Sequence, residues 1–106
     1  MEKFRVFRSK HYKEKLFKLD KSEQDRVKKF EQSLKEQPLS GKPLGYKFFR
    51  EKKFNEKRIL FLVYGEHKCV FLVTITDKKA QQQEIDLIKS NLDFYRKELD
   101  EVLGEL

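Results

Sequence analysis

Basic and aromatic side chains are concentrated in one twelve-residue stretch of the sequence, residues 47–58. Six of these residues are basic, and they are Lys47, Arg50, Lys52, Lys53, Lys57 and Arg58. Phe48, Phe49 and Phe54 are interleaved with them, and Tyr46 directly precedes the stretch. In a β-strand, alternation would place Arg50 and Lys52 on one face. Lys47 and Lys53 would share the other face. Such a surface could hold backbone phosphates while unstacked bases lie on the rings.

Two further lysines follow the last predicted strand. Lys78 and Lys79 come directly after Asp77, at the expected first turn of a helix. There the helix dipole and the unpaired backbone N–H groups favour anions. We expect neighbouring strands to bring these lysines beside Arg58.

A cationic pocket of this kind could cleave RNA without a metal ion. Attack of a ribose 2′-OH on the adjacent phosphate needs a base, a cation that stabilises the phosphorane and an acid for the leaving oxygen. Arginine suits the second role because its donors form a fixed fork, and a lysine crowded by other cations can have its pKa lowered enough to transfer protons. The alternative is a basic surface that binds without catalysis, and these residues alone favour that alternative.

Other chemical signatures are missing from the sequence. It has no Gly-rich phosphate loop, and its two histidines, His11 and His67, lie in unrelated contexts. The single cysteine, Cys69, cannot form an internal disulfide or the paired thiolates of a structural zinc site, and its apolar surroundings predict a core position. For His67 we expect a solvated turn, with proton transfer as the alternative. The sequence therefore predicts no cofactor, no metal and a reducing, cytoplasmic setting.

Length and charge limit the class of protein. The 106 residues form one domain's worth of sequence, so we expect a single domain over 1–106. The net charge is +7, but residues 1–58 carry 19 basic and 9 acidic side chains, whereas residues 59–106 carry 6 and 9. A basic half suits a polyanion, above all nucleic acid, or an acidic protein; a Lys/Glu-rich soluble surface is the alternative. No apolar stretch reaches the roughly 20 residues of a membrane span, so no membrane partner is expected.

The first half of the chain reads as one strand and two helices. Residues 4–8 mix β-branched and aromatic side chains, which indicates a short strand. Apolar residues at helical spacing predict helices over 10–19 and from Ser22, a possible cap, to about residue 34. Residues 38–45 contain both prolines and two of the four glycines, and this composition predicts a loop.

The second half reads as three strands and a helix. Residues 46–54, 58–64 and 68–76 are joined by three-residue links, as in an antiparallel meander. Asp77 could cap a helix over 78–103. Leu87 and Phe94 fall outside the apolar stripe of this helix. They mark either a second contact surface or the margin of the core. The predicted class is α+β, a twisted antiparallel sheet with an N-terminal helical pair and a C-terminal helix.

This order of elements resembles the RelE/ParE toxin superfamily of toxin–antitoxin modules. The most specific resemblance lies in residues 41–50, Gly-Lys-Pro-Leu-Gly-Tyr-Lys-Phe-Phe-Arg, followed by residues 57–64, Lys-Arg-Ile-Leu-Phe-Leu-Val-Tyr. Arg50 matches the arginine of the second strand in that pattern, and Arg58 matches the arginine that opens the third. Residues 77–85 are similar to the Lys-Lys-x-Gln…Glu-Ile run of the HigB-like branch.

The resemblance implies an activity and partners. RelE-like and HigB-like members cleave mRNA on the ribosome and are inhibited by an acidic antitoxin, whereas ParE-like members inhibit DNA gyrase. Carried over, Arg50, Arg58 and Lys78 or Lys79 would act on the scissile phosphate. The RNA-binding lysines would be Lys47, Lys52, Lys53 and Lys57. A tyrosine that RelE-like members carry at the start of the final helix has no match in residues 81–84, which leaves a degenerate, non-catalytic binding module as a further alternative.

Overall fold

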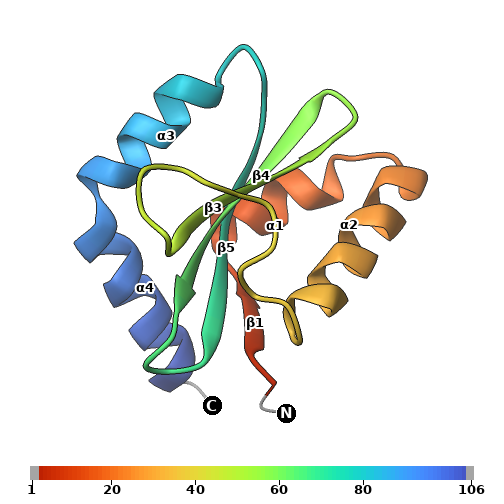
Figure 1. Ribbon diagram of the computed structural model, residues 1–106. Helices are drawn as coiled ribbons and strands as arrows, with labels where there is room; N and C mark the ends of the chain where they lie inside the picture. Colours follow the sequence, from red (N-terminus) through yellow and green to blue (C-terminus); the bar gives the residue numbers. More distant parts are fainter. Residues whose placement is uncertain (1–2, 105–106) are drawn as a thin grey trace.

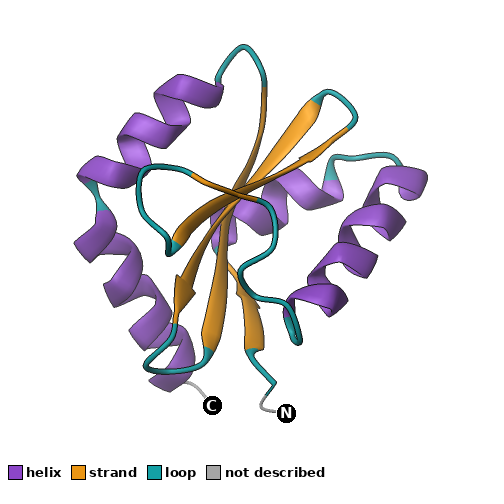
Figure 2. Cartoon of the chain, viewed as in Figure 1, coloured by secondary structure: helices purple, strands orange, loops and turns teal. Residues whose placement is uncertain are grey.

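The computed structural model describes residues 3–104 and contains a mixed five-stranded sheet between two pairs of helices (Figure 1). The elements follow in the order β1 (Arg5–Arg8), α1 (Lys10–Phe17), α2 (Lys21–Leu34), β2 (Lys42–Pro43), β3 (Phe49–Phe54), β4 (Lys57–Tyr64), β5 (Cys69–Asp77), α3 (Gln81–Ser90) and α4 (Leu92–Gly104). The strand order across the sheet is β1-β5-β4-β3-β2. In Figure 2 the sheet runs through the middle of the molecule, with helices to either side. Over the described residues, no helix is both long and apolar enough to cross a membrane.

Strands β3, β4 and β5 form the expected antiparallel meander. The α+β class is confirmed, but the sheet is mixed because β1 pairs with β5 in parallel. The loop 38–45 also contributes the two-residue strand β2, which pairs with β3. Asn55, in the turn between β3 and β4, has a φ of 51°, the left-handed conformation that Asn tolerates better than most residues.

Both faces of the sheet are covered, which explains why β4 and β5 are almost continuously apolar. The face toward α1 and α2 contains a cluster that includes Tyr12, Leu16 and Phe61. The face toward α3 and α4 contains a second cluster, which includes Leu60 and Ile88. Successive side chains of β4 alternate between these two clusters.

A partly buried ionic network joins the first three elements. The Arg8 guanidinium donates to both carboxylate oxygens of Glu31, at 3.0 and 2.7 Å, and the Tyr12 hydroxyl donates to the same carboxylate at 2.8 Å. The hydrogen bond to Glu31 raises the pKa of Arg8, and burial chiefly raises the pKa of Tyr12. Because Glu31 lies in α2, this network holds β1, α1 and α2 together.

The first predicted helix, 10–19, ends at Phe17, and helix boundaries differ from the predictions at three further points. Helix α2 is capped by Asp20, whose side chain accepts from the Glu23 N–H at 2.8 Å, so the cap precedes Ser22. The predicted helix over 78–103 is two helices, and they meet at Asn91, whose side-chain amide donates to the Leu87 carbonyl. That bond competes with the helical hydrogen-bond pattern.

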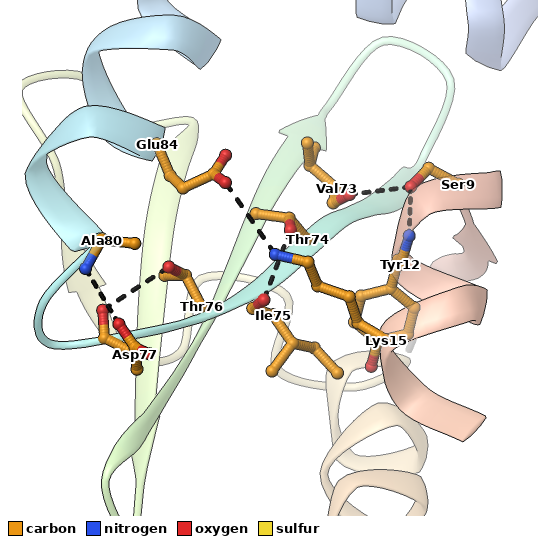
Figure 3. A network of polar contacts seen from close by, with 10 residues as sticks. All are labelled: Ser9, Tyr12, Lys15, Val73, Thr74, Ile75, Thr76, Asp77, Ala80 and Glu84. Atoms are coloured by element: carbon orange, nitrogen blue, oxygen red, sulfur yellow. Dashed lines mark hydrogen bonds and ion pairs between the residues drawn. The ribbon is translucent and has the colours of Figure 1, made fainter. Parts of the chain in front are cut away.

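The third difference concerns the residues before α3. The Asp77 carboxylate accepts from the Ala80 N–H at 2.9 Å and closes a turn, so the helix itself begins at Gln81 (Figure 3). Figure 3 also shows how this region is held to α1: Ser9 donates to the Val73 carbonyl, and Lys15 lies 3.9 Å from the Glu84 carboxylate.

Candidate functional site

A buried carboxylate and a buried guanidinium lie together on the sheet face that α3 and α4 cover. Glu51 of β3 is 6% exposed, Arg58 of β4 is 8% exposed, and 3.6 Å separates a Glu51 carboxylate oxygen from the Arg58 Nε. The register pairs Glu51 with Leu60, which belongs to the α3/α4 cluster, so alternation places Arg58 on that face as well. The two side chains therefore form a buried ion pair.

The first residue of α3 completes this group. The Gln81 side-chain amide donates to the same Glu51 oxygen that faces Arg58. Because Gln81 opens the helix, its position is set by the turn that Asp77 closes. The carboxylate is thus held from two sides by donors, as a base must be if it is to keep one orientation.

Arg58 retains donors beyond this pair. Its Nη1 donates to the Lys57 carbonyl at 3.3 Å, and its Nε faces Glu51. Among the described residues, 3–104, its Nη2 makes no hydrogen bond. Arginine carries five N–H donors in a planar fork, so one edge of Arg58 can still receive a phosphate oxygen.

Lys53 is the strand lysine that lies beside this pair. Cross-strand pairing joins Lys53 directly to Arg58, so both side chains point to the same face, and Lys53 is exposed. Lys78 and Lys79 are exposed in the turn after β5, and the pairing of Lys57 with Asp77 sets that turn next to the start of β4. The structure therefore places Lys53, Arg58, Lys78 and Lys79 at one corner of the molecule. We call Glu51, Lys53, Arg58 and Gln81 the corner site.

Two of the predicted RNA-binding lysines face the other way. Lys52 lies over the Phe30 ring of α2, with its Nζ 5.7 Å from the ring centroid. The Lys57 ammonium is 3.5 Å from the Glu23 carboxylate, also in α2. These side chains belong to the α1/α2 face of the sheet and are separated from the corner site by the sheet itself.

Arg50 also lies on the opposite face of the sheet from the corner site. Its guanidinium donates to three backbone carbonyls, those of Ser40, Gly41 and Lys47, at 2.9 to 3.1 Å. Its register partner is Phe61 of the α1/α2 cluster. In this structure Arg50 therefore fastens the loop before β3, and it does not lie beside Arg58. Lys47 is exposed in that same loop.

The sequence carried a signal for Glu51 that the prediction of site residues omitted. Glu51 is the one acidic residue between Lys47 and Lys53, and strand alternation places it on the face of Lys53. An acidic side chain within a basic run suggests a local ion pair. Nothing comparable marks Gln81, because its position depends on where α3 begins.

The fold is similar to those of several solved structures, although no family model matches the sequence and no curated protein is significantly similar to it. A chain of the RelBE2 toxin–antitoxin complex from Mycobacterium tuberculosis is 23% identical, with a TM-score of 0.64 over 74% of this chain and 94% of that chain. A chain of the RelE–RelB complex from Pyrococcus horikoshii is 18% identical, with a TM-score of 0.64 over 72% and 96% of the two chains. A mutant of the E. coli toxin RelE in the free state is 20% identical, with a TM-score of 0.66 over 80% and 90%. The chain therefore shares the fold of these structures, which include the toxin RelE.

Proposed function

We propose that this protein is the toxin of a type II toxin–antitoxin module and that it cleaves mRNA on the ribosome without a metal ion. The observation that carries the proposal is the corner site, a buried carboxylate and a buried guanidinium beside an exposed lysine, within a RelE-type fold. These groups supply the base, the anion-stabilising cation and the acid that transesterification of RNA requires.

The proposed reaction assigns one role to each of these groups. The Glu51 carboxylate takes the proton of a ribose 2′-OH, and the 2′-oxygen forms a bond to the adjacent phosphorus. Arg58 stabilises the negative charge that develops on the phosphorane oxygens. The P–O5′ bond then breaks, and the Lys53 ammonium protonates the departing oxygen. One fragment ends in a 2′,3′-cyclic phosphate and the other begins with a 5′-hydroxyl.

Lys78 and Lys79 have a supporting role in this proposal. They are exposed at the same corner and precede the first turn of α3, where unpaired backbone N–H groups favour anions. We assign them to the phosphates that flank the scissile one. The Gln81 amide covers Glu51, so a substrate must replace it as the partner of the carboxylate.

We further propose an acidic antitoxin as the inhibitor. Two of the structurally similar chains come from complexes of a toxin with its antitoxin. Residues 1–58 of this chain have a charge surplus of ten, from 19 basic and 9 acidic side chains. Attraction between opposite charges across such an interface should weaken as the salt concentration rises.

Primer extension on a translated mRNA tests the nuclease. We expect discrete new 5′ ends when purified, antitoxin-free protein is added to a translation reaction, and none on the same mRNA without ribosomes. The Glu51→Gln variant should produce no ends, because an amide cannot accept the proton. Lys52→Ala, which changes a lysine on the opposite face, is the matched control and should cleave like the wild type.

Two outcomes would reject the proposal. Folded protein that leaves translated mRNA intact but blocks supercoiling by purified DNA gyrase would be a gyrase inhibitor. Folded protein that does neither, yet binds RNA, would be a non-catalytic binding module.

A further inference from the structure

A second group of aromatic and basic side chains lies at the opposite end of β4 from the corner site. A cavity of about 310 Å³ opens there between the β4–β5 turn and α4, and its walls include Phe48, Tyr64, His67 and Arg96. Tyr64 lies six positions after Arg58 in β4, which corresponds to about 20 Å of extended strand. This cavity is therefore a separate place on the protein surface.

An exposed aromatic stack adjoins the cavity, which one of its two rings, Phe48, lines. The rings of Tyr46 and Phe48 are stacked with their centroids 4.8 Å apart and an angle of 23° between their planes. Tyr46 is 44% exposed and Phe48 is 38% exposed, although aromatic rings of this size are usually buried. The Phe48 carbonyl accepts from the Val63 N–H at 2.8 Å, which fixes the backbone of the stack to the sheet.

The polar groups of the cavity can read the edge of a planar ligand. Arg96 Nη2 lies 2.9 Å from His67 Nε2, and because a guanidinium only donates, the imidazole nitrogen accepts. The other imidazole nitrogen, Nδ1, then carries the proton and is a donor. Burial raises the pKa of Tyr64 to about 12, so its hydroxyl keeps its proton and can also donate.

The charges around the stack favour an anionic ligand. Lys47 lies between the two stacked rings in sequence and is exposed. The Lys89 ammonium reaches the same loop, where a Cβ added to Gly45 would be 2.7 Å from its Nζ. Two acidic residues are near: Glu66 lines the cavity, and Asp100 lies 3.6 Å from the Nε of Arg96. Two lysines, Lys47 and Lys89, thus lie near the stack.

We infer that this region, Tyr46, Phe48, Tyr64, His67 and Arg96, binds a base of single-stranded RNA. The base stacks on the Tyr46–Phe48 pair, its edge meets His67 and Arg96, and the flanking phosphates lie near Lys47 and Lys89. Stacking on exposed rings combined with cations along the backbone is the chemistry by which proteins hold single-stranded nucleic acid. The site binds RNA whether or not the corner site cleaves it, so it does not depend on the proposed nuclease.

Fluorescence anisotropy with a labelled octamer of uridine tests the inference. The double variant Tyr46→Ala/Phe48→Ala should bind the octamer at least about tenfold more weakly than the wild type. Phe17→Ala is the matched control, because Phe17 is a 59% exposed ring on α1, and its affinity should not change. Circular dichroism and thermal unfolding establish that each variant is folded.

The substitution Tyr46→Leu/Phe48→Leu keeps the apolar volume and removes the rings, so it guards against loss of the loop structure. It should be as weak a binder as the alanine variant. The inference would be overturned if either double variant bound the octamer with the affinity of the wild type. It would also be overturned if Phe17→Ala lost as much affinity as the double variants, or if the wild type did not bind the octamer. The experiment measures binding of the octamer without ribosomes, and it does not depend on cleavage. A protein that binds the octamer but leaves translated mRNA intact would therefore reject the nuclease proposal and support this inference.

Discussion

Arg50 and Arg58 lie on opposite faces of one sheet, although both were expected at the same phosphate. Arg50 donates to three loop carbonyls on the α1/α2 side, and Arg58 pairs with Glu51 on the α3/α4 side. One arginine, Arg50, therefore holds the loop before β3. The other, Arg58, has a carboxylate partner, and its Nη2 makes no hydrogen bond among the described residues. Their substitutions should have different effects.

The Glu51–Arg58 pair should be needed for cleavage and should respond to substitution as a unit. We expect Glu51→Gln and Arg58→Gln each to lower the cleavage rate at least about 100-fold. Each single change leaves one buried group without its charged partner, so each should also lower the free energy of unfolding, by about 3 kcal/mol. The double variant Glu51→Gln/Arg58→Gln should recover much of that stability and remain inactive. Urea unfolding and primer extension measure the two effects.

A purely structural ion pair would give another pattern. The double variant would then recover activity together with stability. Cleavage by the double variant at the wild-type rate would therefore remove Glu51 and Arg58 from the reaction.

Lys52 and Lys53 offer a test within one strand. They are adjacent and both exposed, but Lys53 pairs with Arg58 whereas Lys52 lies over Phe30. Lys53→Ala should lower the cleavage rate at least about tenfold, and Lys52→Ala should leave it within about twofold. Both variants lose the same charge, so general attraction to RNA changes equally. Equal rates in the two variants would mean that the face of the sheet is irrelevant and that the corner site is misplaced.

Arg50 should matter for stability. Arg50→Ala removes the donor for three carbonyls, and the free energy of unfolding should fall by about 3 kcal/mol. The cleavage rate per folded molecule should stay close to that of the wild type. Lys47→Ala is the control in the same loop, because its backbone carbonyl still accepts after the side chain is removed. If the Arg50→Ala protein were stable but inactive, Arg50 would instead act on the scissile phosphate.

The turn between β3 and β4 explains why the sequence did not predict this separation of the arginines. The expected link of three residues, 55–57, would pair residue 54 with residue 58 and place Arg50 and Arg58 on the same face. The structure closes the hairpin with two residues, so Phe54 pairs with Lys57. A shift of one residue moves every side chain of a strand to the opposite face. The signal for the shorter turn was Asn55, which adopts the left-handed conformation that tight hairpins require.

The helices and strands were easier to predict than the turns and boundaries between them. Strands β4 and β5 are apolar on both faces, so they are predicted as buried strands whatever register is assumed. The break between α3 and α4 could not be predicted from periodicity, because the apolar stripe continues through Asn91 and only its side-chain bond to Leu87 marks the joint. Leu87 and Phe94, outside that stripe, are 52% and 59% exposed, so they are not core residues of this chain.

The tyrosines predict how the protein responds to alkali. Burial raises the pKa of Tyr12 well above its usual range and that of Tyr64 to about 12. A raised pKa in the folded state means that the unfolded chain loses the proton first, so the stabilising effect is complete below about pH 10 and falls as the pH rises from there. For Tyr12 alone the free energy of unfolding should decrease by about 1.4 kcal/mol per pH unit above pH 10.

The Tyr12→Phe variant isolates this effect. At pH 8 it should be less stable than the wild type by about 1 to 3 kcal/mol, because Glu31 loses the hydroxyl that donates to it at 2.8 Å. Above pH 10 the difference should shrink, since phenylalanine has no proton to lose. Urea unfolding of both proteins at pH 8, 10 and 11 gives the comparison, with Tyr46→Phe as the exposed control. Parallel losses of stability in the wild type and Tyr12→Phe would show that another group, and not Tyr12, governs the alkaline transition.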